Sequence, residues 1–367
     1  MWQSAGTRRR VALLDEGWAQ TIELAMALKD RDHDIIVITA NGRSQLFRQH
    51  GIDWQCGPEL GSPALAPWLE ERITAGAFDH VLPLTERWAY TLWDLAPAWA
   101  DRVYPATAPW QRALLRDKLT MSEHVAAHGV AIPWQRRLAA EADLELDLAA
   151  LPVVVKAARG AGGTQVHIVE TAADLARARA AVARGGDWGV QELIPGPTFL
   201  VGGVFQRGRA IRQYAAEKVE QYPTRTGPAI RLRSASDPRL LALAARVIGA
   251  LDWTGFASVD FVRAADGDYR FLEVNPRPWG SLSAARLAGV DLFTPFAELL
   301  AGGSPAADLA FADGHDCRIF PRYLLAPAYR GLGGALHAVR DWLGPAGRDW
   351  RSPSFVRYAL SALRAPS

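Results

Sequence analysis

The alternation of apolar and polar positions over residues 256–280 predicts a β-hairpin. Apolar residues alternate on both sides of Asp266-Gly267, a dipeptide suited to a two-residue hairpin loop. In that register Asp260 lies directly opposite Glu273, and Asn275 follows two residues later on the same face. The other face carries the apolar residues that would pack in the core: Val259, Phe261, Leu272 and Val274.

Apolar runs and helical periodicity near the N-terminus predict a βαβ opening. Strands are expected at 10–14, 34–39 and 79–84, with a helix over 18–31. We therefore assign 1–106 to an open parallel α/β domain. Ligands of such sheets sit at the carboxyl ends of the strands, so the loops near Asp15, Gly42 and Thr85-Glu86 are candidates for substrate contacts, with ordinary helix capping as the alternative.

The middle of the chain divides into two units of mixed α and β patterning. The first, 107–187, begins with a helix that is expected to run to His128, and its later elements are strands at 152–156 and 165–169 and a helix over 170–184. The second, 188–303, contains the hairpin; its other expected elements are strands at 189–196, 198–206 and 209–216 and helices over 238–251, 281–288 and 292–301. Residues 217–236 are polar and basic, and we expect a mobile loop there.

The C-terminal segment, 304–367, is expected to consist of helices separated by Gly/Pro turns, with Trp342 and Trp350 as apolar anchors. Its second part is basic, because residues 318–367 contain eight Arg against two Asp. This segment could bind an anionic surface or ligand, although helices with solvated arginine faces are the commoner explanation. Nucleic-acid binding is a weak alternative, since no Lys/Arg run is interleaved with regularly spaced aromatic residues.

Composition is that of a soluble globular protein: of 367 residues, 49% are hydrophobic and 22% charged, with a formal net charge of +2. No apolar run approaches the length of a membrane span, and the N-terminus lacks a signal-peptide core. We therefore expect a cytoplasmic protein with no membrane partner. The two cysteines, Cys56 and Cys317, are too few for a disulfide framework or a metal knuckle.

The hairpin carries the first candidate chemistry. Carboxylates directly opposite one another in a hairpin have Cβ atoms roughly 4.5–5.5 Å apart and repel unless a cation lies between them. Asp260, Glu273 and the Asn275 carbonyl are hard oxygen ligands, which suit Mg²⁺ shared with phosphate oxygens. Arg277 follows within a few residues, where its guanidinium could hold a phosphate or a carboxylate. The alternative is an ordinary hairpin with a polar face.

Phosphate-binding signals lie upstream of the hairpin. The predicted strand at 152–156 ends in Lys156, and a glycine-rich stretch follows that contains Gly160, Gly162 and Gly163. Such a loop can close over phosphates with its backbone N–H groups. It is not a Walker loop, because the lysine precedes the glycines, and the Gly-x-Gly-x-x-Gly fingerprint is also absent. Lys118 lies on the preceding predicted helix, where a lone lysine is usually a solvated surface charge. It becomes a candidate phosphate ligand only together with Lys156 and the glycine-rich loop.

Five features follow one another along the chain: Lys118, Lys156, the glycine-rich loop, the Gln191–Ile194 stretch and the Asp260/Glu273-x-Asn275-Pro-Arg277 set. This ordered set resembles the ATP-grasp superfamily. Within the superfamily, the chain resembles the carboxylate–amine ligases related to carbamoyl-phosphate synthase and D-alanine–D-alanine ligase. The resemblance implies an α/β and α+β protein: an N-terminal open parallel α/β domain, a two-lobed ATP-grasp fold and a helical C-terminal tail. The implied lobes are the two middle units, 107–187 with the phosphate loop and 188–303 with the metal site.

The same resemblance implies roles for single residues. ATP phosphates would be held by Lys118 and Lys156 beneath the loop at Gly160, Gly162 and Gly163. Adenine would bind at the hinge, and Arg277 would steady the transferring phosphoryl group, with Lys156 and Arg277 as the catalytic pair. The implied hinge residues are Gln191, Glu192 and Ile194, and the implied Mg²⁺ (or Mn²⁺) ligands are Asp260, Glu273 and Asn275. Thr198 stands where relatives often have an acidic ribose ligand.

The activity that the resemblance implies is ATP-dependent ligation of a small-molecule carboxylate to an amine, through an acyl phosphate, with release of ADP and phosphate. Two alternatives remain open: a nucleotide-binding regulatory or scaffold protein of this fold, and a phosphotransferase or carboxylase that uses the same activated intermediate. A homodimer is compatible with any of them.

Overall fold

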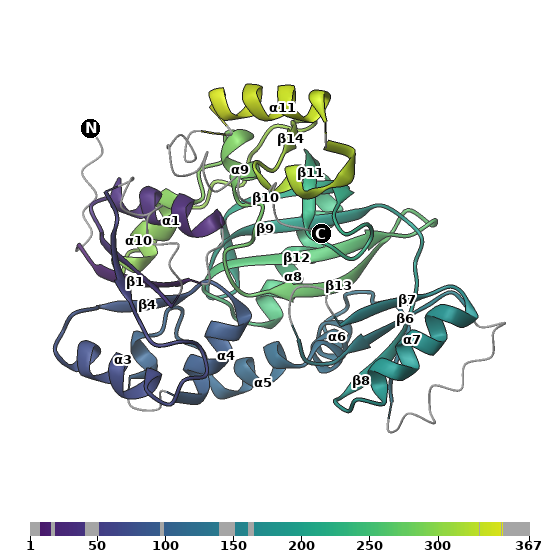
Figure 1. The fold of residues 1–367 in the computed structure, drawn as a ribbon, viewed down its shortest axis with the longest axis horizontal. Coiled ribbons are helices and arrows are strands. Elements are labelled where there is room, and N and C mark those ends of the chain that lie inside the picture. Colours follow the sequence, from purple (N-terminus) through teal and green to yellow (C-terminus); the bar gives the residue numbers. More distant parts are fainter. Residues whose placement is uncertain are drawn as a thin grey trace.

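Three β-sheets follow one another along the chain (Figure 1). The computed structural model describes residues 8–15, 19–40, 51–95, 99–138, 151–160, 165–329, 331–345 and 347. The mixed α/β architecture agrees with the predicted fold class.

The N-terminal sheet is parallel and has the order β3-β2-β1-β4. Its apolar strand residues, such as Val11 and Leu14, are fully buried beneath the flanking helices. The predicted strands are present, and the structure adds the short edge strand β3. The elements are β1 (Arg10–Asp15), α1 (Ala19–Lys29), β2 (Asp34–Thr39), β3 (Asp53–Cys56), α3 (Leu65–Thr74), β4 (His80–Pro83), α4 (Glu86–Leu95) and the 3₁₀ turn η2 (Ala100–Arg102).

The helix that was expected to run unbroken to His128 is two helices. It breaks at Asp117, whose backbone is extended and whose carboxylate accepts hydrogen bonds from the N–H groups of Leu119 (3.0 Å) and Thr120 (2.9 Å). An Asp in this position starts a new helix because it satisfies donors that the first turn leaves free. The two helices are α5 (Pro109–Arg116) and α6 (Lys118–Ala127).

The second sheet is antiparallel, with the order β5-β8-β6-β7, and α7 packs on it through Leu175 and Ala178. In Figure 1 it forms a small lobe at one end of the molecule. The strands are β5 (Gln135–Leu138), β6 (Val153–Ala157), β7 (Val166–Val169) and β8 (Trp188–Glu192), and α7 spans Ala172–Val182.

The third sheet has six strands in the order β13-β12-β9-β10-β11-β14 and is the centre of the molecule (Figure 1). One face packs on α8 (Pro238–Ala250), and α9 (Ser283–Leu287) and α10 (Phe293–Leu300) belong to the core on the other. The strands are β9 (Thr198–Gln206), β10 (Arg209–Gln221), β11 (Ala229–Ser234), β12 (Gly255–Arg263), β13 (Tyr269–Asn275) and β14 (Asp316–Arg318).

The predicted mobile loop at 217–236 is wrong. Most of this segment continues β10 and forms β11, which pair from Ala216 with Ser234 to Gln221 with Ala229. The polar residues suggested a solvated loop, but one face of these strands lies at the centre of the molecule and carries polar side chains. Lys218, for example, is largely buried rather than solvated.

The hairpin has the predicted facing pair but not the predicted turn. Asp260 pairs with Glu273, whereas Phe261 pairs with Phe271, so that Leu272 is an extra, bulged residue. The connection is also longer than the two residues expected: it spans 264–268, and Gly267, at φ +83°, donates to the Ala264 carbonyl (2.9 Å). The bulge offsets the odd-length loop. Phe271, not Leu272, therefore takes the core position.

The C-terminal segment is not purely helical. β14 adds a strand to the edge of the large sheet, and two 3₁₀ turns precede the last described helix. Among the described residues no helix combines the length and the apolar character that crossing a membrane requires. The remaining elements are η5 (Arg322–Leu325), η6 (Pro327–Tyr329) and α11 (Leu332–Leu343).

A close approach on the large sheet yields a testable expectation. Gly202 of β9 lies against the ring of the buried Trp279, where an added Cβ would fall 2.8 Å from ring atom Cε2 and nearer still to two others. Gly202→Ala should therefore lower the free energy of unfolding by about 1–3 kcal/mol through overpacking. Chemical denaturation followed by circular dichroism measures the change.

The matched control is Gly249→Ala on α8, where an added Cβ has only one neighbour, 3.9 Å away. Alanine favours a helix over glycine, so this variant should be no less stable than the wild type. Equal stability of the two variants would contradict the proposed packing of Trp279.

Candidate active site

The two hairpin carboxylates lie side by side on the polar face of the large sheet, where Asp260 is buried and Glu273 is half-buried. Asp260 and Glu273 are paired residues of β12 and β13, and the Asn275 amide lies 3.4 Å from Glu273 Oε1. Asp260 Oδ1 is buried without a hydrogen-bond partner among the described residues. An oxygen left in that state costs free energy, so the geometry favours a ligand that supplies a positive charge or a donor.

Two lysines neutralise this pair from different elements. Lys118, the first residue of α6, donates to Glu273 Oε2 at 3.0 Å. Lys218 of β10 forms an ion pair with Asp260. Lys218 was not predicted as a site residue, because the sequence placed it in an expected loop. The alternation typical of a strand continues beyond residue 216, and this signal could have identified it.

The pKa values of the two carboxyl groups are shifted in opposite directions. The charge of Lys118 holds the pKa of Glu273 at about 2, despite burial. Burial raises the pKa of Asp260, and the neighbouring Glu273 adds to this, so that the attraction of Lys218 is outweighed. Such a split is expected when two acidic groups share a site. A divalent cation would favour the ionised form of both.

Lys156 is the second predicted phosphate ligand and stands near the end of β6. Its side chain is buried, and burial together with the charge of Lys118 lowers its pKa to about 8. The charge of Glu273 also acts on it, in the opposite direction. The structure thus brings both predicted lysines and the two hairpin carboxylates into one electrostatic cluster.

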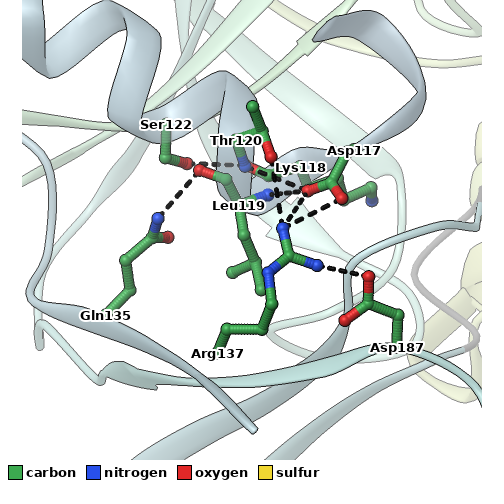
Figure 2. Close-up of polar contacts among 8 residues, drawn as sticks. All are labelled: Asp117, Lys118, Leu119, Thr120, Ser122, Gln135, Arg137 and Asp187. Carbon is green, nitrogen blue, oxygen red and sulfur yellow. Dashed lines mark hydrogen bonds and ion pairs between the residues drawn. The ribbon is translucent and has the colours of Figure 1, made fainter. Parts of the chain in front are cut away.

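Lys118 is held in place by an ion-pair bridge (Figure 2). Arg137 of β5 binds both oxygens of the capping residue Asp117, at 2.8 and 2.9 Å, and also forms an ion pair with Asp187. Although burial alone would raise the pKa of Asp117, hydrogen bonds from Arg137 and Thr120 lower it below its usual value. The bridge ties the start of α6 to the small lobe.

The glycine-rich stretch begins beside this bridge. The backbone N–H of Lys118 donates to the Ala158 carbonyl at 2.8 Å. Gly160 has φ +145°, and a Cβ there would collide with the Gln165 side chain, so this position requires glycine. Gly162 and Gly163 lie outside the described residues.

The predicted hinge lies at the end of β8, where the small lobe gives way to the large sheet. Glu192 exchanges hydrogen bonds with Trp134, whose carbonyl accepts from the Glu192 N–H at 2.8 Å. Gln191 is buried, and its Nε2 has no partner in the part of the chain that is described. Ile194 is half-buried just beyond the strand. Thr198 bonds to Gln221 at 3.2 Å.

Arg277 meets the N-terminal domain. Its guanidinium forms an ion pair with Glu86 at 2.7 Å, and both side chains are largely buried. A further bond runs to the Pro278 carbonyl at 3.0 Å. The paired charge of Glu86 outweighs burial and raises the pKa of Arg277. Glu86 is the first residue of α4, at the carboxyl end of β4, where the sequence predicted substrate contacts near Thr85-Glu86.

Residues 115–281 match the ATP-grasp domain family. This part of the chain is an ATP-grasp domain. No curated protein matches the chain by sequence.

Solved structures share the fold of most of the chain. The protein is similar to biotin carboxylase from Campylobacter jejuni (17% identity, TM-score 0.67, 84% of this chain and 74% of that chain). It is also similar to an ADP complex of N5-carboxyaminoimidazole ribonucleotide synthetase (16%, 0.68, 84% and 80%) and to L-amino acid ligase from Bacillus licheniformis (17%, 0.62, 82% and 76%).

The donor set of the ATP-grasp domain fits Mg²⁺ better than a transition metal. No cluster of three or more His, Cys, Asp and Glu side chains suited to a metal occurs within the described ranges. Asp260, Glu273 and Asn275 offer only oxygen ligands, and the unpartnered Asp260 oxygen is available for coordination. Magnesium binds such incomplete oxygen sets when substrate phosphates and waters complete its shell.

The Arg137 bridge is testable by its contribution to stability. Arg137→Ala removes the cation between Asp117 and Asp187, so we expect the free energy of unfolding to fall by about 1 kcal/mol, the upper end for a partly exposed pair. Arg177→Ala is the matched control, because Arg177 is 68% exposed and forms a local ion pair with Asp174 of the same helix, α7. It should change stability by less than about 0.5 kcal/mol. Equal losses in thermal denaturation would contradict a special role for the bridge.

Proposed function

We propose that the protein is an ATP-dependent ligase that joins a small-molecule carboxylate to an amine. The observation that carries the proposal is the convergence of Lys118 and Lys156 from the small lobe on Asp260 and Glu273 of the large lobe, with Arg277 a few residues away. Phosphoryl transfer needs this combination, because it depends on positioning and on charge neutralisation rather than on a nucleophilic side chain.

In the proposed reaction a carboxylate oxygen attacks the γ-phosphorus of ATP, and the bond to ADP breaks. The acyl phosphate then reacts with the amine nitrogen, which forms the amide bond and loses a proton as phosphate departs. Lys118 and Lys156 would exchange their carboxylate surroundings for ATP phosphates, and Arg277 would hold the transferring group. Mg²⁺, or Mn²⁺ in its place, would neutralise phosphate charge at Asp260, Glu273 and Asn275.

We also propose which residues bind the adenine and which cover the phosphates. Glu192 and Ile194, with Gln191 behind them, would receive the adenine, and the loop at Gly160, Gly162 and Gly163 would cover the phosphates. The names of the similar structures support ATP-dependent activation of a carboxyl group, since they include a carboxylase, a synthetase and an amino acid ligase.

The first test is turnover. ADP formation is measured with a panel of acids and amines, and products are identified by mass. Glu273→Gln and Lys156→Ala should each lower ADP formation by about 10²–10³-fold, the usual cost of removing one preorganised electrostatic group. Glu71→Gln, which changes a carboxylate that is 78% exposed on α3, is the control and should have no effect.

Three outcomes would argue against the ligase. Unchanged turnover in both site variants would remove the site assignment. Binding of Mg-ATP without ADP formation with any acceptor would favour a regulatory or scaffold protein. A carboxylated or phosphorylated product with no amide would favour the carboxylase or phosphotransferase reading.

The second test uses the lowered pKa of Lys156. With a pKa of about 8, the side chain is charged below that pH and neutral above it, and the charged form binds phosphate better. The Kd of Mg-ATP should therefore rise by about tenfold between pH 7 and pH 9, as the charged fraction falls. Calorimetric titration measures this. Lys156→Arg stays charged across the range, so its Kd should not follow the same slope; an identical slope would contradict the assignment.

A further inference from the structure

Two histidines lie one turn apart at the C-terminal end of α6. His124 is in the last turn of the helix and His128 is its C-cap residue, so their side chains lie on the same face. The centroids of the two rings are 4.5 Å apart, at an interplanar angle of 47°. With metal–nitrogen bonds of about 2.0–2.1 Å, two imidazoles bound to one ion have ring centres roughly 4.5–5 Å apart. The two rings are therefore as close as a shared metal ion requires.

Hydrogen bonds determine which nitrogen of each neutral ring carries the proton. His124 Nε2 lies 3.0 Å from the Ala250 carbonyl oxygen at the end of α8, and His128 Nδ1 lies 2.8 Å from the His124 carbonyl oxygen. A carbonyl oxygen only accepts, so these two nitrogens donate and the opposite ones, His124 Nδ1 and His128 Nε2, keep their lone pairs. Metal-binding histidines have this arrangement, because the donated proton fixes the tautomer and raises the basicity of the ligating nitrogen.

The surroundings of the pair are accessible to a cation. His128 is exposed and His124 is half-buried. Both lie at the negative end of the dipole of α6, which favours a positive charge. Arg246 of α8 opposes it, because its guanidinium donates to the Gly129 carbonyl at 2.8 Å. With two protein ligands and this arginine close by, a Kd of about 1–100 μM is expected, far weaker than that of a four-ligand zinc site.

We propose that His124 and His128 form a binding site for a transition-metal ion of the Zn²⁺, Ni²⁺ and Cu²⁺ class. Imidazole nitrogens suit these ions, whereas Mg²⁺ prefers oxygen, so the site is chemically distinct from the one proposed at Asp260 and Glu273. Groups of three or more His, Cys, Asp and Glu side chains suited to a metal are absent from the described ranges, so water completes the coordination of the ion.

The site lies at a contact between the two middle units of the chain. His124 belongs to 107–187 and Ala250 to 188–303, so the hydrogen bond between them joins α6 to the end of α8. An ion on His124 Nδ1 would restrain the ring that makes this bond. Metal binding is thereby coupled to the position of α6, whose first residue is Lys118.

The first experiment measures Zn²⁺ binding to the untagged full chain by calorimetry, with excess Mg²⁺ to occupy oxygen sites. His128→Gln should raise the Kd of Zn²⁺ at least tenfold, because a single imidazole remains. His337→Gln is the matched control and should leave the Kd unchanged. His337 of α11 also has its Nδ1 2.8 Å from the carbonyl four residues earlier, that of Gly333, but has no other histidine within four residues.

A spacing variant tests the geometry at a constant number of histidines. The double variant Ala126→His, His128→Gln places the second imidazole two residues from His124, on a different side of the helix. It should bind Zn²⁺ as weakly as His128→Gln alone. A Kd within twofold of the wild type in either variant overturns the proposal.

The second experiment identifies the ligands directly. Electron paramagnetic resonance of the chain with one equivalent of Cu²⁺ should show two coordinated imidazole nitrogens in the wild type and one in His128→Gln. A wild-type spectrum with oxygen ligands alone overturns the proposal. Neither experiment uses turnover, so both results hold whether or not the ligase function is confirmed.

Discussion

The repulsion between Asp260 and Glu273 is the constraint on which the rest of the site depends. Two paired carboxylates on a buried sheet face are unstable unless positive charge surrounds them. The chain supplies that charge from two other elements, Lys118 of α6 and Lys218 of β10, and from Arg277 just beyond the end of β13. The charge of Lys118 keeps the pKa of Glu273 low, whereas burial raises the pKa of Asp260, and the same cations are suited to phosphate oxygens.

The N-terminal domain and the small lobe both contact the cations that surround the two carboxylates. Arg277 is compensated by Glu86 of the N-terminal domain, and Lys118 is fixed relative to the small lobe by the Asp117–Arg137–Asp187 bridge. Trp279 packs on Gly202 of β9 and thereby fixes the segment after β13 that carries Arg277. Each part of the chain therefore contributes a contact to the same centre, and a change in one of these contacts is expected to alter the position of a reactive group.

The resemblance between this protein and the solved ATP-grasp structures is one of fold, at 16–17% identity for the three compared. The residues that we propose to bind the nucleotide lie within the matched 115–281 range. Glu86 lies outside it, on the N-terminal domain. Substrate choice is expected to depend on this flanking domain, because it presents a charge that the nucleotide does not need.

Local patterns were enough to predict much of the chain. The alternation of residues determined that Asp260, Glu273 and Asn275 share a face, and apolar runs identified the parallel strands of the first domain. The turn of the hairpin could not be predicted, because the odd loop and the bulge at Leu272 compensate for one another in the paired register. The break at Asp117 was signalled only by a capping residue inside an otherwise helical pattern.

Which charges meet depends on how distant segments pack together. Lys218 reaches Asp260 because β9 lies between their two strands, and Glu86 reaches Arg277 because the carboxyl end of β4 faces the loop after β13. Arg322 reaches Gly280 because the C-terminal segment folds back beside the large sheet. Such contacts depend on sheet order and on packing between distant segments, which side-chain periodicity does not encode. Alternation along the two strands thus identified the polar face of the hairpin, and the fold brought the partners of that face to it.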